Sequence, residues 1–356
     1  MEPVGVFVAI LCMAKEVERR AMIRRSYESM RLQGDREGMA AVRVKFFSGR
    51  PRNAAEEEEV KAEMEAYDDL IILPITENLN QGKTFSVFER AAKNARVPSC
   101  TFKRTSNSGW SAECAGERAP DYVFKADMDT FLVLPELERR MRIMPRSKLY
   151  WGREHPLFFR FGAGYGLSFD LVQYIAESPF VRSHLRGQED QRVGDWLRAH
   201  PEANRVVWLT EECWMYDHPK AAQPWTHGFI FPDTIRALNQ DTAQDLTPPW
   251  VSGEELERWS TTSPSHASYA PVTTNLTHDQ SAESLVEGSK LSLLHAHNLQ
   301  DPLNDDERSR RIAEAWAGRP TREDRMAGWE TGSTIWVHSV KKDEWWRDAE
   351  AVLLGN

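Results

Sequence analysis

The chain has 356 residues, of which 41% are hydrophobic and 28% are charged, a composition typical of soluble enzymes with one large domain or two small ones. The formal net charge is -9 and the Lys and Arg residues are scattered, which excludes the basic face that nucleic-acid binding needs. The first apolar run, residues 4–14, is about half the roughly 20 residues of a membrane-spanning helix. We therefore expect a buried strand there, no transmembrane anchor within the chain and no nucleic-acid partner.

Short β-branched or aromatic runs alternate with helical patterns through the first two-thirds of the chain. This alternation predicts an α/β domain with a mostly parallel central sheet. The predicted strands cover residues 6–11, 42–47, 70–73, 122–126 and 206–209. The predicted helices between them, each rich in helix-forming residues, cover residues 16–30, 54–67 and 83–95.

The composition changes in the last third of the chain. Residues 241–284 are rich in Ser, Thr, Pro, Asp and Gln, which predicts a long surface loop or insertion. The patterns that follow are helical at 285–298 and 305–317, a strand at 334–340, and a helix at 343–354 that Gly355 ends. We therefore expect a core at 1–240, an insertion at 241–333, and a C-terminal strand and helix at 334–356 that complete the core.

The four cysteines lack the CxxC spacing of a zinc site. Cys100 and Cys114 are near enough in sequence to close a short loop as a disulfide in an oxidising compartment. Buried free thiols are an equally good interpretation. The sequence leaves both open.

Two carboxylates end the apolar strand pattern at 122–126. Asp127 and Asp129 flank Met128, and alternate residues of an extended chain project to the same side. Ligands collect at the carboxyl ends of strands in open α/β sheets, where hard oxygen ligands can hold Mn²⁺ or Mg²⁺ against a diphosphate. A pair of solvated turn aspartates is the alternative, and the spacing by itself does not decide between them.

Several further segments give the acidic pair a context. In chain order they are RRAMIRRSY at 19–27, YDDLI at 67–71 with ENLNQGKT at 77–84, DMD at 127–129, FGAGYGLS at 161–168, EDQRVG at 189–194 and WVHSVK at 336–341. Together they resemble glycosyltransferase family 31, the β1,3-galactosyltransferases and N-acetylglucosaminyltransferases, and its fungal branch in particular. Tyr27 stands where the family usually has Trp, and Met128 where it usually has an acid. Because the spacer need not bind metal, we expect the second departure to be tolerated.

The resemblance implies a GT-A-like fold and an inverting, metal-dependent transfer of galactose or an N-acetylhexosamine. The donor would be a UDP-sugar and the acceptor a hydroxyl of a glycan or glycoprotein. Asp190 corresponds to the family's proposed base, because a carboxylate near the acceptor hydroxyl can take its proton. An acid at the start of a helix is also a favourable partner for the helix dipole, and that alternative stays open.

The same resemblance implies a Mn²⁺ or Mg²⁺ ion held by Asp129 and His338. Asp127 would bind the metal through water or hold the ribose. Such an ion would stabilise the charge that builds on the leaving diphosphate.

Other interpretations compete with His338 as the histidine ligand. His338 falls in a predicted strand, so a hydrogen-bonded core histidine is one alternative. His227 is a second candidate ligand. His295 and His297 lie two positions apart in a predicted helix, where their side chains would diverge and chelate poorly.

The donor and the cleft complete the implied site. The cations expected at the nucleotide or its phosphates, where they would complement a negatively charged leaving group, are Arg20, Arg24 and Lys83. Asn78 would act with Lys83 or simply shape a turn, and Arg19 is expected to be solvated. The segment at 161–168 is expected as a turn that lines the donor and acceptor cleft. The implied cleft residues are Gly162, Gly164, Tyr165 and Glu189.

A binding protein that keeps the pocket without turnover is the main alternative function, and Tyr27 and Met128 are the departures that leave it open. A metal-dependent phosphohydrolase would need a denser cluster of Asp and His for two metals, which the sequence lacks. Family members are usually Golgi type II membrane proteins, so we expect a lumenal catalytic domain without its anchor. A full-length chain that starts so close to its first strand would instead be cytoplasmic.

Overall fold

The structure, a computed structural model, describes residues 4–32, 39–104, 110–142, 144–155, 159–211, 215–217, 294–296 and 334–354. The chain separates into two compact units, residues 1–208 and residues 209–356. The expected boundaries after residues 240 and 333 fall outside the described ranges, so they stay predictions.

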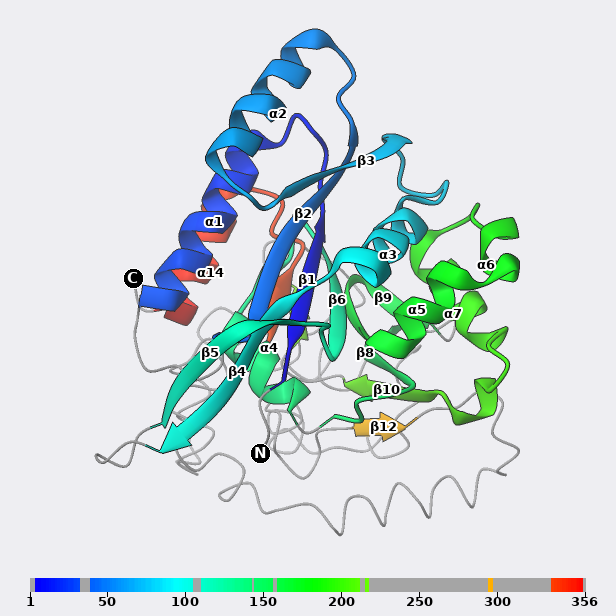
Figure 1. Ribbon diagram of the computed structural model, residues 1–356. Helices are drawn as coiled ribbons and strands as arrows, with labels where there is room; N and C mark the ends of the chain where they lie inside the picture. Colours follow the sequence, from blue (N-terminus) through cyan, green and yellow to red (C-terminus); the bar gives the residue numbers. More distant parts are fainter. Residues whose placement is uncertain are drawn as a thin grey trace, which may run out of the picture. The chain divides into compact units, whose positions relative to one another are not determined.

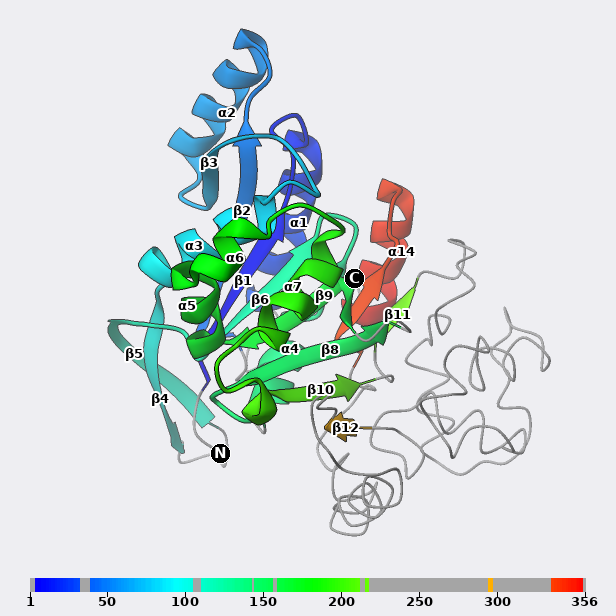
Figure 2. The ribbon, with the colours of Figure 1, turned by 90° about the vertical axis from the view of Figure 1, so that its right-hand side faces the viewer.

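The first unit is built on a twisted sheet (Figures 1 and 2). In spatial order its strands are β8 (Leu149–His155), β9 (Phe159–Ser168), β6 (Tyr122–Asp127), β1 (Val6–Leu11), β2 (Val42–Arg50) and β3 (Leu70–Thr76). The strands from β6 to β3 pair in parallel, whereas β9 pairs antiparallel with both β6 and β8. The expected α/β class with a parallel core is confirmed.

Helices cover both faces of this sheet. The helices of the first unit are α1 (Val17–Leu32), α2 (Ala54–Ala66), α3 (Lys83–Asn94), α4 (Leu134–Met141), α5 (Phe169–Glu177), α6 (Pro179–Ser183) and α7 (Glu189–Arg198). Helix α1 lies on one face, and α3, α5 and α7 lie on the other (Figures 1 and 2). Phe85 and Phe88 of α3 are buried and meet the rings of Trp196 and Tyr165, so apolar periodicity fixes how α3 and α7 sit on the sheet.

The strand register sets up the functional edge of the sheet. Leu11 at the end of β1 pairs with Asp127 at the end of β6, so the first aspartate of the expected metal motif (residues 127–129) lies at the carboxyl edge of the parallel strands. On the other side of β6, Lys125 pairs with Tyr165 and Ala126 pairs with Gly164. Residues 161–168, expected as a turn, therefore form most of strand β9, and this expectation was wrong. The segment contains three glycines, which are uncommon in strands, so its sequence predicted a turn although it pairs with β6.

A two-stranded hairpin, β4 (Val97–Arg104) and β5 (Trp110–Arg118), follows α3. Cys100 pairs directly with Cys114 across the hairpin, and the two form a disulfide. Of the two interpretations of these cysteines, the disulfide is therefore the one observed. Cys12, by contrast, is buried and free.

The second unit is described over short ranges. Strand β10 (Val207–Glu211), which begins in the first unit, pairs antiparallel with β12 (Leu294–Ala296), while β11 (Met215–Asp217) pairs in parallel with β13 (Trp336–His338). Helix α14 (Asp343–Leu354) has the expected bounds. The helix expected over 285–298 is wrong at β12, and the one expected over 305–317 lies outside the described residues. Within the described ranges, none of the helices combines the length and apolar character that crossing a bilayer requires.

Candidate active site

The metal motif alternates between open and buried side chains. Asp127 and Asp129 are half-buried, whereas Met128 between them is only 8% exposed. Thr130 donates its backbone N–H to the carbonyl of Asp127 at 3.1 Å, which closes a turn around the motif. Both carboxylates are therefore partly accessible at the sheet edge, whereas the methionine between them is buried.

Lys125 is the centre of a buried charge cluster that the sequence analysis missed. Its ammonium is fully buried and lies 2.8 Å from Asp127 Oδ1 and 3.3 Å from Glu189 Oε2. It also donates to the carbonyl of Gly162 at 2.5 Å. The signal in the sequence was a single cation in an apolar strand, two residues before Asp127 and so on the same face.

Glu189 and Asp190 open helix α7 beside this ammonium. Tyr165 donates its hydroxyl to Glu189 Oε1 at 2.5 Å, which leaves both oxygens of that carboxylate engaged. Asp190 Oδ1 accepts the backbone N–H of Gln191 at 2.8 Å. A Cβ added to Gly162 would lie 3.3 Å from Asp190 Oδ2, so β9 passes directly against the proposed base. Of the four expected cleft residues, Gly162 and Glu189 contact Lys125, and Tyr165 contacts Glu189. The fourth, Gly164, pairs with Ala126 next to Lys125.

Burial shifts the acidities in this cluster. The pKa of Asp127 is raised to about 6, chiefly by burial, with Lys125 opposing the shift and Glu189 adding to it. The pKa of Asp190 is also raised, first by burial and then by the charge of Glu189. Burial works against the charge of Lys125, but the two carboxylates outweigh it and raise its pKa. A carboxylate with a raised pKa is a stronger base than an ordinary one, which suits Asp190 to proton transfer.

The chain is similar in sequence to one curated glycosyltransferase. A curated beta-1,3-galactosyltransferase, pvg3 of Schizosaccharomyces pombe, is 30% identical to the chain over 179 residues, which cover 43% of this chain and 47% of that protein. The chain is glycosyltransferase-like. It spans about half the length of this curated relative. No family model matches the chain.

Two solved glycosyltransferase structures are also similar to the chain. The galactosyltransferase LgtC in complex with donor and acceptor sugar analogues has a TM-score of 0.32 and 8% identity, covering 54% of this chain and 70% of LgtC. Mouse xyloside xylosyltransferase 1 in its apo form has a TM-score of 0.30 and 13% identity, covering 60% of this chain and 87% of that enzyme. Both TM-scores are low, so the relationship rests on the sequence match.

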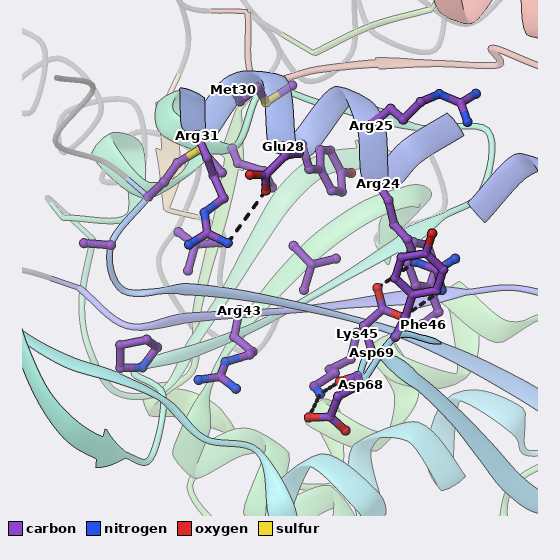
Figure 3. A pocket seen from close by; sticks show the side chains of 18 of the residues that line it. Arg24, Arg25, Glu28, Met30, Arg31, Arg43, Lys45, Phe46, Asp68 and Asp69 are labelled. Atoms are coloured by element: carbon purple, nitrogen blue, oxygen red, sulfur yellow. Dashed lines mark hydrogen bonds and ion pairs between the residues drawn. The ribbon is translucent and has the colours of Figure 1, made fainter. Parts of the chain in front are cut away.

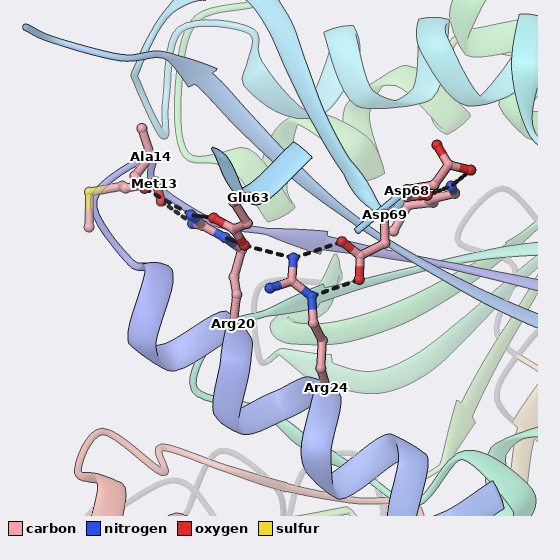
Figure 4. A network of polar contacts seen from close by, with 8 residues as sticks. Met13, Ala14, Arg20, Arg24, Glu63, Asp68 and Asp69 are labelled. Atoms are coloured by element: carbon pink, nitrogen blue, oxygen red, sulfur yellow. Dashed lines mark hydrogen bonds and ion pairs between the residues drawn. The ribbon is translucent and has the colours of Figure 1, made fainter. Parts of the chain in front are cut away.

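Arg20 of the glycosyltransferase-like chain is not placed to bind a nucleotide. Its side chain is fully buried, and its guanidinium donates to both oxygens of Glu63 at 2.8 and 2.5 Å. The same group donates to the carbonyls of Met13 and Ala14 at 2.6 and 2.9 Å (Figure 4). With these bonds made and no exposed surface, Arg20 fastens α1 to α2 and to the loop after β1, which corrects the expected phosphate contact.

Arg24 extends the same network (Figure 4). It pairs with Glu63 at 2.7 Å and donates to both oxygens of Asp69 at 2.8 and 2.7 Å. Its guanidinium lies 4.2 Å from the centre of the Tyr67 ring. Burial alone would raise the pKa of Glu63, but its hydrogen bonds and charge pairing with the two arginines lower it overall. The expected contact of Arg24 with phosphates is therefore replaced by structural ion pairs.

Lys83 and Asn78 shape the loops at the functional edge. Lys83 is 3% exposed, and its ammonium donates to the carbonyl of Cys12 at 2.6 Å and to Glu77 at 2.5 Å. Asn78 accepts the backbone N–H of Gln81 at 2.9 Å and donates to Thr76, which is the turn-forming role considered for it. Lys83 thus holds the segment after β1 at the same sheet edge as Asp127, without an exposed ammonium to offer to a phosphate.

Arg19 has a role that the sequence analysis missed. It was expected to be solvated, but its Nε donates to the carbonyl of Met128 at 3.1 Å. Helix α1 therefore braces the metal motif directly. No local signal in the sequence pointed to this contact, because helix periodicity directed Arg19 to solvent.

The histidine ligand is left undecided. His338 is half-buried on β13 in the second unit, where its Nδ1 lies 3.1 Å from Ser339 Oγ. His227 and His297 lie outside the described residues. His295 is on strand β12, so the helical geometry that argued against it does not apply. Among the described residues, no group of three or more His, Cys, Asp or Glu is arranged to hold a metal ion. The metal role of His338 stays a prediction.

A separate cavity of about 950 Å³ lies between α1 and β2 (Figure 3). It is lined by charges of both signs, including Arg25, Glu28 and Arg43, and by Tyr27, whose buried hydroxyl has no hydrogen-bond partner among the described residues. The cavity reaches the first half of β2, at residues that pair with the start of β1. It is therefore at the amino ends of the parallel strands, away from the edge where ligands of α/β sheets bind.

Proposed function

We propose that this chain is an inverting, metal-dependent glycosyltransferase. It would transfer galactose or an N-acetylhexosamine from a UDP-sugar to a hydroxyl of a glycan or glycoprotein. The observation that carries the proposal is that one buried ammonium, Lys125, joins Asp127 of the metal motif to Glu189, the neighbour of the proposed base Asp190. The similarity to a galactosyltransferase supports the reaction class.

The chemistry is a direct displacement at the anomeric carbon. The acceptor oxygen forms a bond to that carbon as the bond to the UDP oxygen breaks, and the configuration inverts. Asp190 takes the proton of the acceptor hydroxyl, for which its raised pKa is suited. Asp190 lies at the start of α7 against Gly162, where an added Cβ would be 3.3 Å from its Oδ2, so any larger residue on β9 would crowd the carboxylate.

The carboxylates of Asp127 and Asp129 fit a hard divalent cation, because both are partly exposed at the end of β6 and supply oxygen ligands. Mn²⁺ or Mg²⁺ bound there would supply positive charge to the leaving diphosphate. The proposal that His338 completes the ligand set comes from the family resemblance. Arg20 and Arg24 are not part of the proposed donor site.

A secretory location is part of the proposal. The Cys100–Cys114 disulfide is the kind of bond that forms and persists in oxidising compartments. The curated relative is a galactosyltransferase, and the family resemblance points to the Golgi lumen. Both observations favour a lumenal catalytic domain.

The test is UDP release by the purified protein with a panel of UDP-sugars, in Mn²⁺ and in EDTA. We expect one donor to be turned over only with metal, and Asp129→Ala and Asp190→Asn to leave only a small residual turnover. Asp195→Asn is the matched control, because Asp195 lies on the same helix α7 and only pairs with Arg192 and Arg198 at the surface. UDP binding without turnover, even with an acceptor library, would favour the binding protein. A protein that does not bind UDP would overturn the proposal.

A further inference from the structure

Glu189 is held on both sides of its carboxylate. Tyr165 of β9 donates to Oε1 at 2.5 Å, and Lys125 of β6 lies 3.3 Å from Oε2. The Glu189 side chain is 7% exposed and the Lys125 side chain is fully buried. Each oxygen of this nearly buried carboxylate has a partner within the protein, which indicates that Glu189 holds other parts of the structure in place.

What Glu189 holds is the first turn of α7. The N-cap residue, Gln188, makes no side-chain capping hydrogen bond, although a capping side chain is the usual means of fixing a helix start. The side chain of Glu189 supplies an anchor instead, from the first helical residue to two different strands of the sheet. Asp190 is the next residue of the helix, so the contacts of Glu189 also fix the position of Asp190.

We propose that Glu189 is a positioning residue, which clamps the start of α7 to β6 and β9 and so fixes the carboxylate of Asp190 for proton transfer. This inference rests on the proposed function, in which Asp190 is the base. Lys125 makes the clamp reach further, because the same ammonium lies 2.8 Å from Asp127. The ammonium of Lys125 therefore links helix α7, which carries Asp190, to the end of strand β6, which carries Asp127.

The chemical logic predicts a particular kinetic signature. A residue that only orients the base acts on the chemical step and leaves ground-state binding of the donor unchanged. Supporting residues of this kind typically contribute roughly 10- to 100-fold. Glu189→Gln keeps the shape of the side chain and an oxygen that can accept from Tyr165, but it removes the charge that pairs with Lys125.

The experiment compares Glu189→Gln with Glu177→Gln, a matched control on the exposed end of α5. For Glu189→Gln we expect kcat to fall roughly 10- to 100-fold, while KM for the UDP-sugar and calorimetric binding of UDP with Mn²⁺ stay within about twofold. Glu177→Gln should match the wild type in all three. A rise in KM with unchanged kcat would contradict the positioning role, as would an active Glu189→Gln.

A double variant separates positioning from general stabilisation. In the Asp190→Asn background the base is already lost, so Glu189→Gln should cause no further loss of the residual turnover. A further loss of tenfold would show that Glu189 acts by another route and would overturn the proposal.

Hydrogen exchange tests the clamp without any activity. Glu189→Gln should speed amide exchange over residues 189–193, the first turn of α7, and Glu177→Gln should leave it unchanged. If the wild type turns over no donor, the proposed function fails, and the clamp stands or falls on this exchange result. Unchanged exchange in Glu189→Gln would refute the clamp in an active or an inactive enzyme.

Discussion

Lys125→Met tests the charge cluster at its centre. Methionine keeps most of the apolar volume, but the carboxylates of Asp127 and Glu189 lose an ammonium at 2.8 and 3.3 Å. Removing one partner of a buried ion pair costs about 3–5 kcal/mol. Because the Asp127 side chain is 31% exposed and so partly solvated, we expect the lower end, about 3 kcal/mol. For a unit of this size that is a fall in Tm of roughly 6–12 °C.

The cost should depend on pH in a defined direction. The pKa of Asp127 in the folded protein is about 6, above its ordinary 3.8, so ionising Asp127 destabilises the fold as pH rises through this window. Without Lys125 the folded pKa rises further, and the penalty of the variant is largest near pH 7. At pH 5 Asp127 is mostly protonated in the folded state, and the penalty shrinks.

The assay is urea unfolding in EDTA at pH 7 and pH 5, followed by circular dichroism. Lys148→Met is the matched control, since Lys148 is 24% exposed and pairs with Glu202 at 2.8 Å, a surface pair worth about 0–1 kcal/mol. A loss for Lys125→Met no larger than that of the control, or an equal loss at both pH values, would refute the reasoning.

Three further outcomes follow from the site. The pKa of Asp190 is raised above its ordinary 3.8 by burial and then by Glu189, so kcat/KM should fall with decreasing pH through a value above 3.8. Glu189→Gln removes the charge of Glu189 and so lowers the pKa of Asp190. The acid limb of the pH–rate profile of this variant should therefore move to lower pH. Gly162→Ala puts a methyl group 3.3 Å from Asp190 Oδ2, whereas Gly164→Ala puts one 2.9 Å from a buried phenylalanine ring. Gly162→Ala should therefore lower kcat with little change in Tm, and Gly164→Ala should lower Tm because overpacking costs about 1–3 kcal/mol. The reverse pattern would contradict the geometry. Arg20→Met should cost about 3 kcal/mol of stability in urea unfolding, the lower end for a broken buried pair, because Glu63 loses Arg20 at 2.5 Å but keeps Arg24 at 2.7 Å. UDP affinity in the fraction that remains folded should be unchanged, and a selective loss of UDP binding would restore Arg20 to the donor site.

Periodicity was enough to predict the parallel half of the sheet. Strand β1 is apolar at almost every position, as a strand buried on both faces must be, and its expected bounds are those observed. The antiparallel strands β8 and β9 were missed. Their segments mix glycine, arginine and aromatic residues, and only pairing with β6 gives them a strand pattern. Local sequence cannot reveal such pairing, because the partners are far apart along the chain.

In the candidate site, too, local features could be predicted from the sequence and long-range contacts could not. The carboxyl-edge position of Asp127 could be predicted, because strand ends and acidic spacing are local features. The roles of Arg20 and Lys125 could not. A cation in sequence looks the same whether it faces a phosphate or a buried carboxylate, and only the tertiary partners, Glu63 for Arg20 and Glu189 for Lys125, distinguish the two. The family pattern selected candidate residues but did not separate those expected to touch substrate from those that hold the scaffold.

The central claim is tested most directly by following the anomeric configuration of the product. With the donor identified by UDP release, ¹H NMR of the protein with that UDP-sugar, Mn²⁺ and an acceptor glycan would record the first product formed. The account predicts a glycoside of configuration opposite to that of the donor, formed by the wild type and far more slowly by Asp190→Asn. A product that retains the donor configuration, or equal product formation by Asp190→Asn, would contradict it.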